Sequence, residues 1–190
     1  MAVGMIVGPA IRHTQINLPR TLPDLTPRPR LLGQLNHALR LPITVIAAPA
    51  GMGKTTLLSI WAETCPLPVA WLSVEASDSQ PEPYLRGLIA SIQTLYPAFG
   101  RSTLTALNGA TIPSAHALAT GLAAELDELD QELVVILDDY EAVGDPATHQ
   151  IMRELLPRLP LTTHLVIASR QMPLFPMTRL RAQGAVLDVL

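Results

Sequence analysis

Residues 43–56 read ITVIAAPAGMGKTT, and this stretch decides the fold. Its first six residues, 43–48, form a continuous apolar run rich in β-branched side chains, which is typical of a strand covered on both faces in a parallel sheet. A loop containing two glycines follows, and a helix is expected from about Lys54 to Glu63. A strand, a glycine loop and a helix in this order predict a phosphate-binding loop.

The loop itself matches the pattern G-x-x-x-x-G-K-[ST] of P-loop proteins (Walker A), except that its first position is Ala48 instead of glycine. We expect its backbone N–H groups and the start of the next helix to bind phosphate oxygens. Lys54 would reach the β- and γ-phosphates, and the Thr55 hydroxyl would bind Mg²⁺. Lys54 is also the only lysine among 13 basic residues, which supports the motif independently of its glycines. The predicted nucleotide-binding residues of the loop are Ala50, Gly51, Met52, Gly53, Lys54, Thr55 and Thr56.

Apolar runs alternate with helical patterns along the rest of the chain. Strands are predicted at 69–74, 133–137, 165–168 and 185–190, and helices at 30–40, 84–96, 114–129 and 146–157. Residues 97–113 are predicted as a loop with at most one short turn of helix. The sequence therefore predicts an α/β fold, a three-layer α/β/α sandwich of the P-loop NTPase class, with a mainly parallel five-stranded sheet. Residues 30–190 would form this domain, and the proline-rich residues 1–29 an extended N-terminal arm.

Charged residues follow the third and fourth predicted strands. Because the carboxyl ends of parallel strands meet at one edge of a sheet, these residues should lie near the phosphate loop. Asp138 is the candidate magnesium ligand, and Asp139 the candidate base that activates the attacking water. Arg170 would contact the γ-phosphate or stabilise charge in the transition state. A polar turn for the aspartates and a structural salt bridge for Arg170 are the alternatives. Glu75 and Asp78, after the second strand, are expected to be solvated loop acids.

Composition limits the classes of function. A formal net charge of -3 gives no overall basic field, so we expect no direct binding of nucleic acid by this chain. The single cysteine, Cys65, cannot form an internal disulfide and fits the reducing cytoplasm. No apolar run approaches the roughly 18–20 residues that a membrane span needs. The low share of charged residues, 15%, fits either an ordinary packed domain or a surface that meets another domain or subunit.

Five blocks of sequence, residues 27–32, 48–56, 69–73, 137–140 and 168–170, resemble the NTPase domain of STAND ATPases. Within that class the chain looks like the maltose-regulator and large LuxR-type bacterial transcription activators. The resemblance implies an AAA+-related fold, ATP and ADP as ligands with Mg²⁺, and slow hydrolysis that acts as a conformational switch. It also implies that the ATP-bound form self-associates, and that the turn formed by Pro29 and Arg30 lies against the adenine or the ribose.

Proteins of this kind continue into a winged-helix module, helical repeats and a terminal helix-turn-helix, which this sequence lacks. We therefore expect either a domain of a longer regulator or a short stand-alone relative, with nucleotide and further domains or copies of itself as partners. Two other functions stay open at this point. One is a small-molecule P-loop kinase, since many such kinases have about this length. The other is a non-catalytic interaction module that nucleotide stabilises.

Overall fold

The centre of the molecule is a parallel β-sheet. The computed structural model describes residues 11–20, 28–173, 181–182 and 186–189. Within these residues the sheet has five strands in the order β2-β3-β4-β1-β5, and every neighbouring pair is parallel. The predicted fold class is thereby confirmed. The strands are β1 (Ile43–Ala47), β2 (Val69–Ser73), β3 (Leu133–Asp138), β4 (Thr163–Ser169) and β5 (Val186–Val189).

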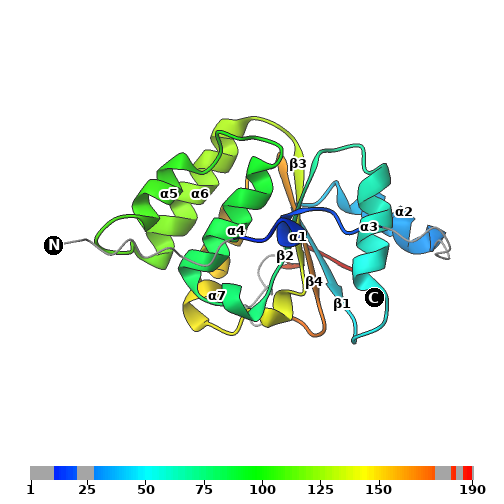
Figure 1. Cartoon of the computed structure of the whole chain (residues 1–190). Helices are drawn as coiled ribbons and strands as arrows, with labels where there is room; N and C mark the ends of the chain where they lie inside the picture. Colours follow the sequence, from blue (N-terminus) through cyan, green and yellow to red (C-terminus); the bar gives the residue numbers. More distant parts are fainter. Residues whose placement is uncertain (1–10, 21–27, 174–180, 183–185, 190) are drawn as a thin grey trace.

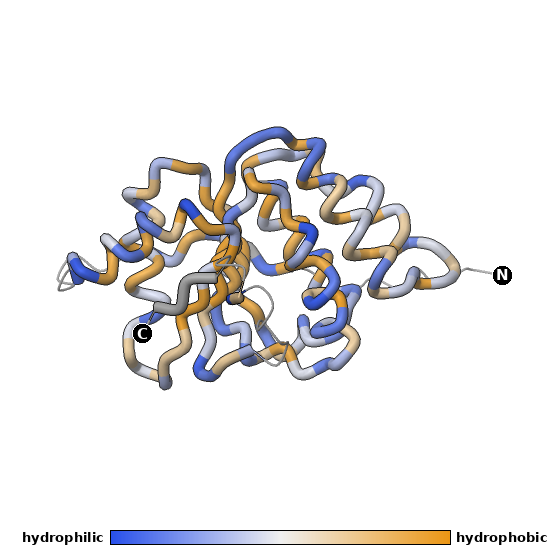
Figure 2. Tube along the Cα trace, turned by 180° about the vertical axis from the view of Figure 1, so that it is seen from behind, coloured by the Kyte–Doolittle hydropathy of each residue, from blue (hydrophilic) through white to orange (hydrophobic). Residues whose placement is uncertain are grey.

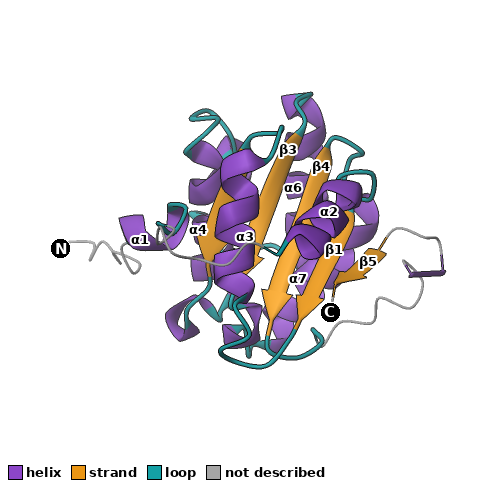
Figure 3. Ribbon diagram, turned by 90° about the vertical axis from the view of Figure 1, so that its right-hand side faces the viewer, coloured by secondary structure: helices purple, strands orange, loops and turns teal. Residues whose placement is uncertain are grey.

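Helices cover both faces of the sheet (Figure 1). Those of the described residues are α1 (His13–Ile16), α2 (Pro29–Ala38), α3 (Lys54–Thr64), α4 (Pro81–Gln93), α5 (Arg101–Leu107), α6 (Ala115–Leu129) and α7 (Pro146–Leu155), with short 3-10 turns η1 (Ala76–Asp78), η2 (Tyr140–Ala142) and η3 (Leu156–Arg158). Helices α4 to α7 lie on one side of the sheet, and α2 and α3 on the other. Figure 3 looks onto the α2 and α3 side, with β3, β4, β1 and β5 next to one another behind them.

Alternate residues of each central strand enter two separate cores. In β3, Leu133, Val135 and Leu137 pack toward α4 to α7, whereas Val134 and Ile136 pack toward α2 and α3. A strand with both faces buried needs apolar residues at every position, which is why its sequence is an unbroken apolar run. The hydrophobic band through the middle of Figure 2 is this doubly covered sheet.

Three helical segments differ from the sequence-based prediction. Helix α4 begins at Pro81, three residues before the predicted start, because proline is compatible with the first turn of a helix. Helix α5 fills part of the predicted 97–113 loop. Its first N–H groups are capped from another helix: Glu125 of α6 accepts hydrogen bonds from Ser102 N (2.9 Å) and Thr103 N (3.2 Å). No sequence pattern near residue 101 predicts a cap that another helix supplies.

The third difference lies in the predicted N-terminal arm, whose described residues are not wholly extended. Helix α1 packs against β2, the outer strand of the sheet, and beside α4 (Figure 3). Gln15 Nε2 donates to Asp78 Oδ2 at 2.9 Å, so Asp78 is buried and not a solvated loop acid as predicted. Ile16 packs on the core under α4, whereas Leu18 packs on the core under α3. Residues 16–18 therefore pass around the edge of the sheet.

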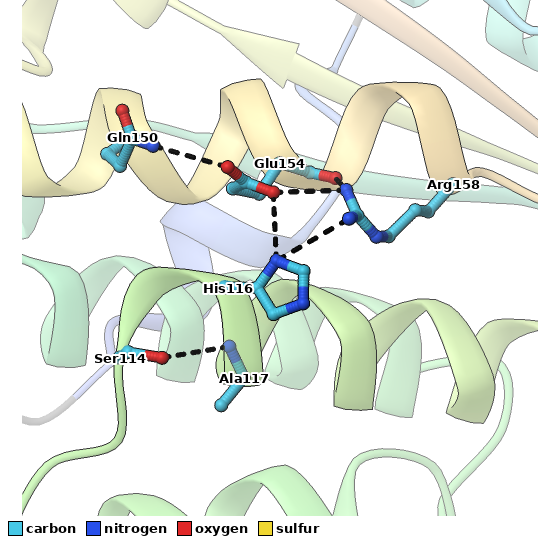
Figure 4. A network of polar contacts seen from close by, with 6 residues as sticks. All are labelled: Ser114, His116, Ala117, Gln150, Glu154 and Arg158. Atoms are coloured by element: carbon cyan, nitrogen blue, oxygen red, sulfur yellow. Dashed lines mark hydrogen bonds and ion pairs between the residues drawn. The ribbon is translucent and has the colours of Figure 1, made fainter.

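Helices α6 and α7 are joined at the surface by a polar network (Figure 4). Glu154 of α7 pairs with His116 Nδ1 of α6 at 3.1 Å and with Arg158 Nη1 at 3.1 Å. The hydrogen bond from His116 is the main cause of a lowered pKa of Glu154. Such exposed pairs fix the relative placement of the two helices more than they stabilise the fold.

Candidate functional site

The loop between β1 and α3 is shaped by two glycines. Gly51 and Gly53 both have φ of +78°, a left-handed conformation that residues with a Cβ seldom adopt. Among the described residues other than glycine, only Asp130 and Asp139 have positive φ. Ala48 therefore has an ordinary conformation, and its departure from the first glycine of the pattern introduces no backbone strain.

Gly53 caps the amino end of α3, so the first N–H groups of that helix have no acceptor within it. These donors and the positive end of the helix dipole make the loop suited to an anion. The ammonium of Lys54 adds a full positive charge. Its Nζ donates to the carbonyl oxygens of Ala48 (2.8 Å) and Pro49 (3.4 Å), and the residue is 8% exposed.

Asp138 is the last residue of β3 and lies next to Thr55, in the first turn of α3. Its Oδ2 accepts a hydrogen bond of 2.7 Å from Thr55 Oγ1, and its Oδ1 accepts one of 3.0 Å from Asp139 N. Burial, which leaves Asp138 1% exposed, raises the pKa of its carboxyl. The Thr55 hydrogen bond and the charge of Lys54 lower the pKa and offset part of this effect.

Residues from three strand ends surround one polar pocket of about 320 Å³. Its lining consists of Ala50, Gly51, Gly53, Lys54, Thr55, Thr56, Asp139 and Arg170. Strands β3 and β1 lie on either side of β4, and the chain leaves β1 toward α3 on one face of the sheet and β3 toward α7 on the other. Connections that part in this way open a crevice at the carboxyl ends of the strands.

A second cavity, of about 380 Å³, lies between the end of α4 and the end of α6. Leu95, Tyr96, Phe99 and Leu129 supply most of its apolar lining, and it contains no lysine or arginine. A triphosphate needs cationic and N–H donors. The smaller pocket at the phosphate loop is therefore the candidate site.

Comparison with known proteins agrees with this geometry. The chain is 31% identical over 176 residues to the HTH-type transcriptional regulator MalT of Cronobacter sakazakii, and equally to that of Yersinia enterocolitica. Each alignment covers 93% of this chain and 19% of the regulator. By its sheet and its loop the chain is a P-loop NTPase domain, similar in sequence to part of the MalT regulators. It spans about a fifth of their length.

A solved structure supports the fold of this NTPase domain. The Walker-type ATPase PABY2304 of Pyrococcus abyssi superimposes with a TM-score of 0.51 at 16% identity, over 79% of this chain and 47% of the ATPase. Similarity at this level of identity concerns the fold alone. No model of a known protein family matches the chain.

Three of the predicted nucleotide-binding residues do not line the pocket, and neither does Asp138, the predicted magnesium ligand, which is buried at the end of β3. Pro29 and Arg30 form the exposed start of α2, and Met52 is 53% exposed at the tip of the loop. From the turn before α2, the residue that contacts the loop is Arg28, whose Nη1 donates to Met52 O at 3.1 Å. Sequence reasoning missed Arg28, although it precedes Pro29 in the same motif.

Glu141 is a second residue near the pocket that the sequence did not indicate. Its Oε1 lies 2.7 Å from Arg170 Nε, and its Oε2 accepts a hydrogen bond of 2.9 Å from Arg170 N. The predicted alternative for Arg170, a structural salt bridge, is thus present in the structure. It coexists with the position of Arg170 in the pocket lining.

Replacing Asp138 with asparagine is expected to stabilise the protein in the absence of nucleotide and Mg²⁺. A carboxyl whose folded pKa is raised destabilises the fold as pH rises above its ordinary value, and this cost is complete once pH has passed the folded pKa. Asparagine can still bond Thr55 and Asp139 N without a buried charge. We expect about 1 kcal/mol, or about 2–4 °C in Tm, in thermal unfolding with EDTA at pH 7.

The matched control is Asp139→Asn, which removes the same charge from an exposed side chain next to Asp138. Its Tm should stay within about 1 °C of the wild type, because surface substitutions usually change stability by less than about 0.5 kcal/mol. A lower Tm for Asp138→Asn than for the wild type would show that the buried charge is not a net cost.

Proposed function

We propose that this domain binds Mg-ATP at the phosphate loop and hydrolyses it slowly, and that the bound nucleotide sets its conformational state. The observation that carries the proposal is the polar pocket, where Lys54, Asp139 and Arg170 meet from three different strand ends. The loop and Lys54 supply donors for the β- and γ-phosphates. Asp139 supplies a carboxylate for a water molecule, and Arg170 a guanidinium for the terminal phosphate.

The donor atoms near the loop fit Mg²⁺. Thr55 Oγ1 and Asp138 Oδ2 are hard oxygen ligands held 2.7 Å apart, and Mg²⁺ is usually bound by one or two protein oxygens together with phosphates and water. Within the described residues no group of three or more His, Cys, Asp or Glu side chains forms a complete metal site. Thr55 and Asp138 would hold the ion, which would neutralise charge on the phosphate oxygens.

The reaction proposed for this site is the transfer of the γ-phosphoryl group to water. A water oxygen bonds to the γ-phosphorus, the bond between that phosphorus and the bridging oxygen breaks, and ADP and inorganic phosphate are formed. Asp139 orients the water and accepts its proton. Lys54 and Arg170 stabilise the charge that develops on the transferred oxygens and on ADP.

Regulation is the biological role that we propose for this reaction. The relatives are named HTH-type transcriptional regulators, and this chain spans only about a fifth of them. We therefore assign to it the nucleotide-dependent step and not the contact with DNA, in line with its net charge of -3. Its partners would be further domains of a cytoplasmic regulator, or other copies of this domain in the ATP-bound form. Among the described residues no helix could cross a bilayer.

Replacing Asp139 with alanine is expected to leave ATP binding nearly unchanged and to lower the rate of hydrolysis by about 10²–10⁴. The side chain faces the pocket but is not one of the donors to phosphate. Phosphate release measures the rate, and calorimetry measures the affinity.

Adding alcohol or sugar acceptors to the wild type separates a hydrolase from a small-molecule kinase: a kinase would consume ATP only with an acceptor.

The matched control is Asp145→Ala. Asp145 also lies between β3 and α7, but its side chain caps α7 by accepting a hydrogen bond from Ala147 N. This variant should lose some stability, about 1 kcal/mol, and keep its rate of hydrolysis. Wild-type turnover in the Asp139→Ala variant would contradict the role given to Asp139.

A further inference from the structure

Glu141 fixes both the main chain and the side chain of Arg170. One carboxylate oxygen accepts from Arg170 N, and the other lies against Arg170 Nε. Glu141 belongs to η2, the turn that follows β3, whereas Arg170 follows β4. The hydrogen bond to Arg170 N holds the main chain, and the 2.7 Å ion pair places Nε of the guanidinium next to the same carboxylate.

The burial of the two partners is unequal. The side chain of Glu141 is 16% exposed, and that of Arg170 is 63% exposed. The carboxylate therefore forms the base of the pair, and the guanidinium extends outward from it along the wall of the pocket. Because the close contact is made by Nε, the Nη groups form the far end of the guanidinium. These two groups can donate to two oxygens of one phosphate, because the guanidinium fork matches their spacing.

The same turn also places Asp139. Asp139 has φ of 53° and begins η2, and its carbonyl oxygen accepts a hydrogen bond of 2.9 Å from Ala142 N. The tight turn directs Asp139 to the pocket and Glu141, two residues later, to Arg170. Asp139 and Glu141 thus belong to one turn after β3. Through Glu141 this turn also contacts Arg170, which follows β4.

We propose that Glu141 is a positioning residue that orients the Arg170 guanidinium toward the γ-phosphate and thereby sets the preference of the domain for ATP over ADP. This inference rests on the proposed function. ADP has no γ-phosphate, so a misplaced Arg170 weakens ATP binding and leaves ADP binding almost unchanged. A merely structural role would weaken both nucleotides equally or neither.

The test compares affinities for ADP and a non-hydrolysable ATP analogue by calorimetry in five proteins: wild type, Glu141→Ala, Glu141→Gln, Arg170→Ala and the double alanine variant. Glu141→Ala should lower the ratio of ATP to ADP affinity about tenfold and change ADP affinity less than about twofold. Glu141→Gln keeps an acceptor for Arg170 N but loses the charge, and should fall between Ala and wild type. In the Arg170→Ala background, Glu141→Ala should change the ratio no further.

Glu154→Ala is the matched control, since Glu154 also pairs with an arginine but on α7, away from the pocket (Figure 4). It should keep the wild-type ratio. Additive losses in the double variant, an equal loss for both nucleotides, or a wild-type ratio in Glu141→Ala would each overturn the inference while the proposed function stands. A wild-type protein that binds neither nucleotide would overturn the proposed function itself, and the inference with it.

Discussion

Lys54→Ala is expected to abolish the thermal stabilisation that ATP gives the domain. A ligand at a hundredfold excess over its Kd stabilises the folded state by about 2.7 kcal/mol, which for a chain of this size corresponds to about 5–10 °C in Tm. Lys54 supplies a nearly buried ammonium at the start of α3, within the pocket lining. Without it the β- and γ-phosphates would lose their buried cation and keep only the loop N–H groups and the exposed Arg170, so binding should fall below detection.

The measurement is thermal unfolding of wild type and variant, each with and without Mg-ATP. Lys54 also donates to the carbonyl oxygens of Ala48 and Pro49, so the variant without nucleotide serves as the reference for its own stability. The control is Arg158→Ala, which also removes one positive charge, but from η3, where Arg158 pairs with Glu154 and does not line the pocket. It should keep the full ATP shift. Equal shifts in wild type and Lys54→Ala would refute the nucleotide assignment.

Arg170→Ala is expected to lower the rate of ATP hydrolysis by about 10³–10⁵, the range for an arginine placed on a transferring phosphoryl group. The reason is that Arg170, directly after β4, lines the pocket next to the end of β1, from which the loop that carries Lys54 begins. Single-turnover release of phosphate measures this rate even if product release is slow in the wild type.

Arg170→Lys separates charge from geometry. A lysine keeps the positive charge but has neither the Nε that Glu141 contacts nor the two Nη donors. It should recover no more than a small part of the lost rate. Hydrolysis at the wild-type rate in Arg170→Ala would leave the salt bridge with Glu141 as the only role of this side chain.

The sequence predicted the sheet and the loop because both are encoded locally. A strand such as β3 must be apolar at every position, and the start of α3 must have glycine where φ is positive. The predicted starts of the helices at 114 and 146 agree with the structure, where Ser114 and Asp145 cap α6 and α7 by accepting hydrogen bonds from Ala117 N and Ala147 N.

Features that depend on distant residues were missed for a physical reason. Helix α5 has its cap on α6, and α1 is held by contacts with residues more than sixty positions away. Glu141 and Arg28 act through contacts with residues distant in the sequence, and neither produces a periodic pattern. The Pro29 and Arg30 assignment came from resemblance alone. No hydrogen bond or pocket contact of the described residues tests it.

The passage of residues 16–18 around β2 limits how copies of this domain can associate. An uncovered outer strand offers a row of N–H and C=O groups to which a strand of another molecule can add. Here α1 and the residues after it occupy that position, tied to the turn beyond β2 by Gln15 and Arg12. Growth of a continuous intermolecular sheet at β2 would first require this segment to detach. Assembly that leaves it in place must instead bury helix or loop surfaces.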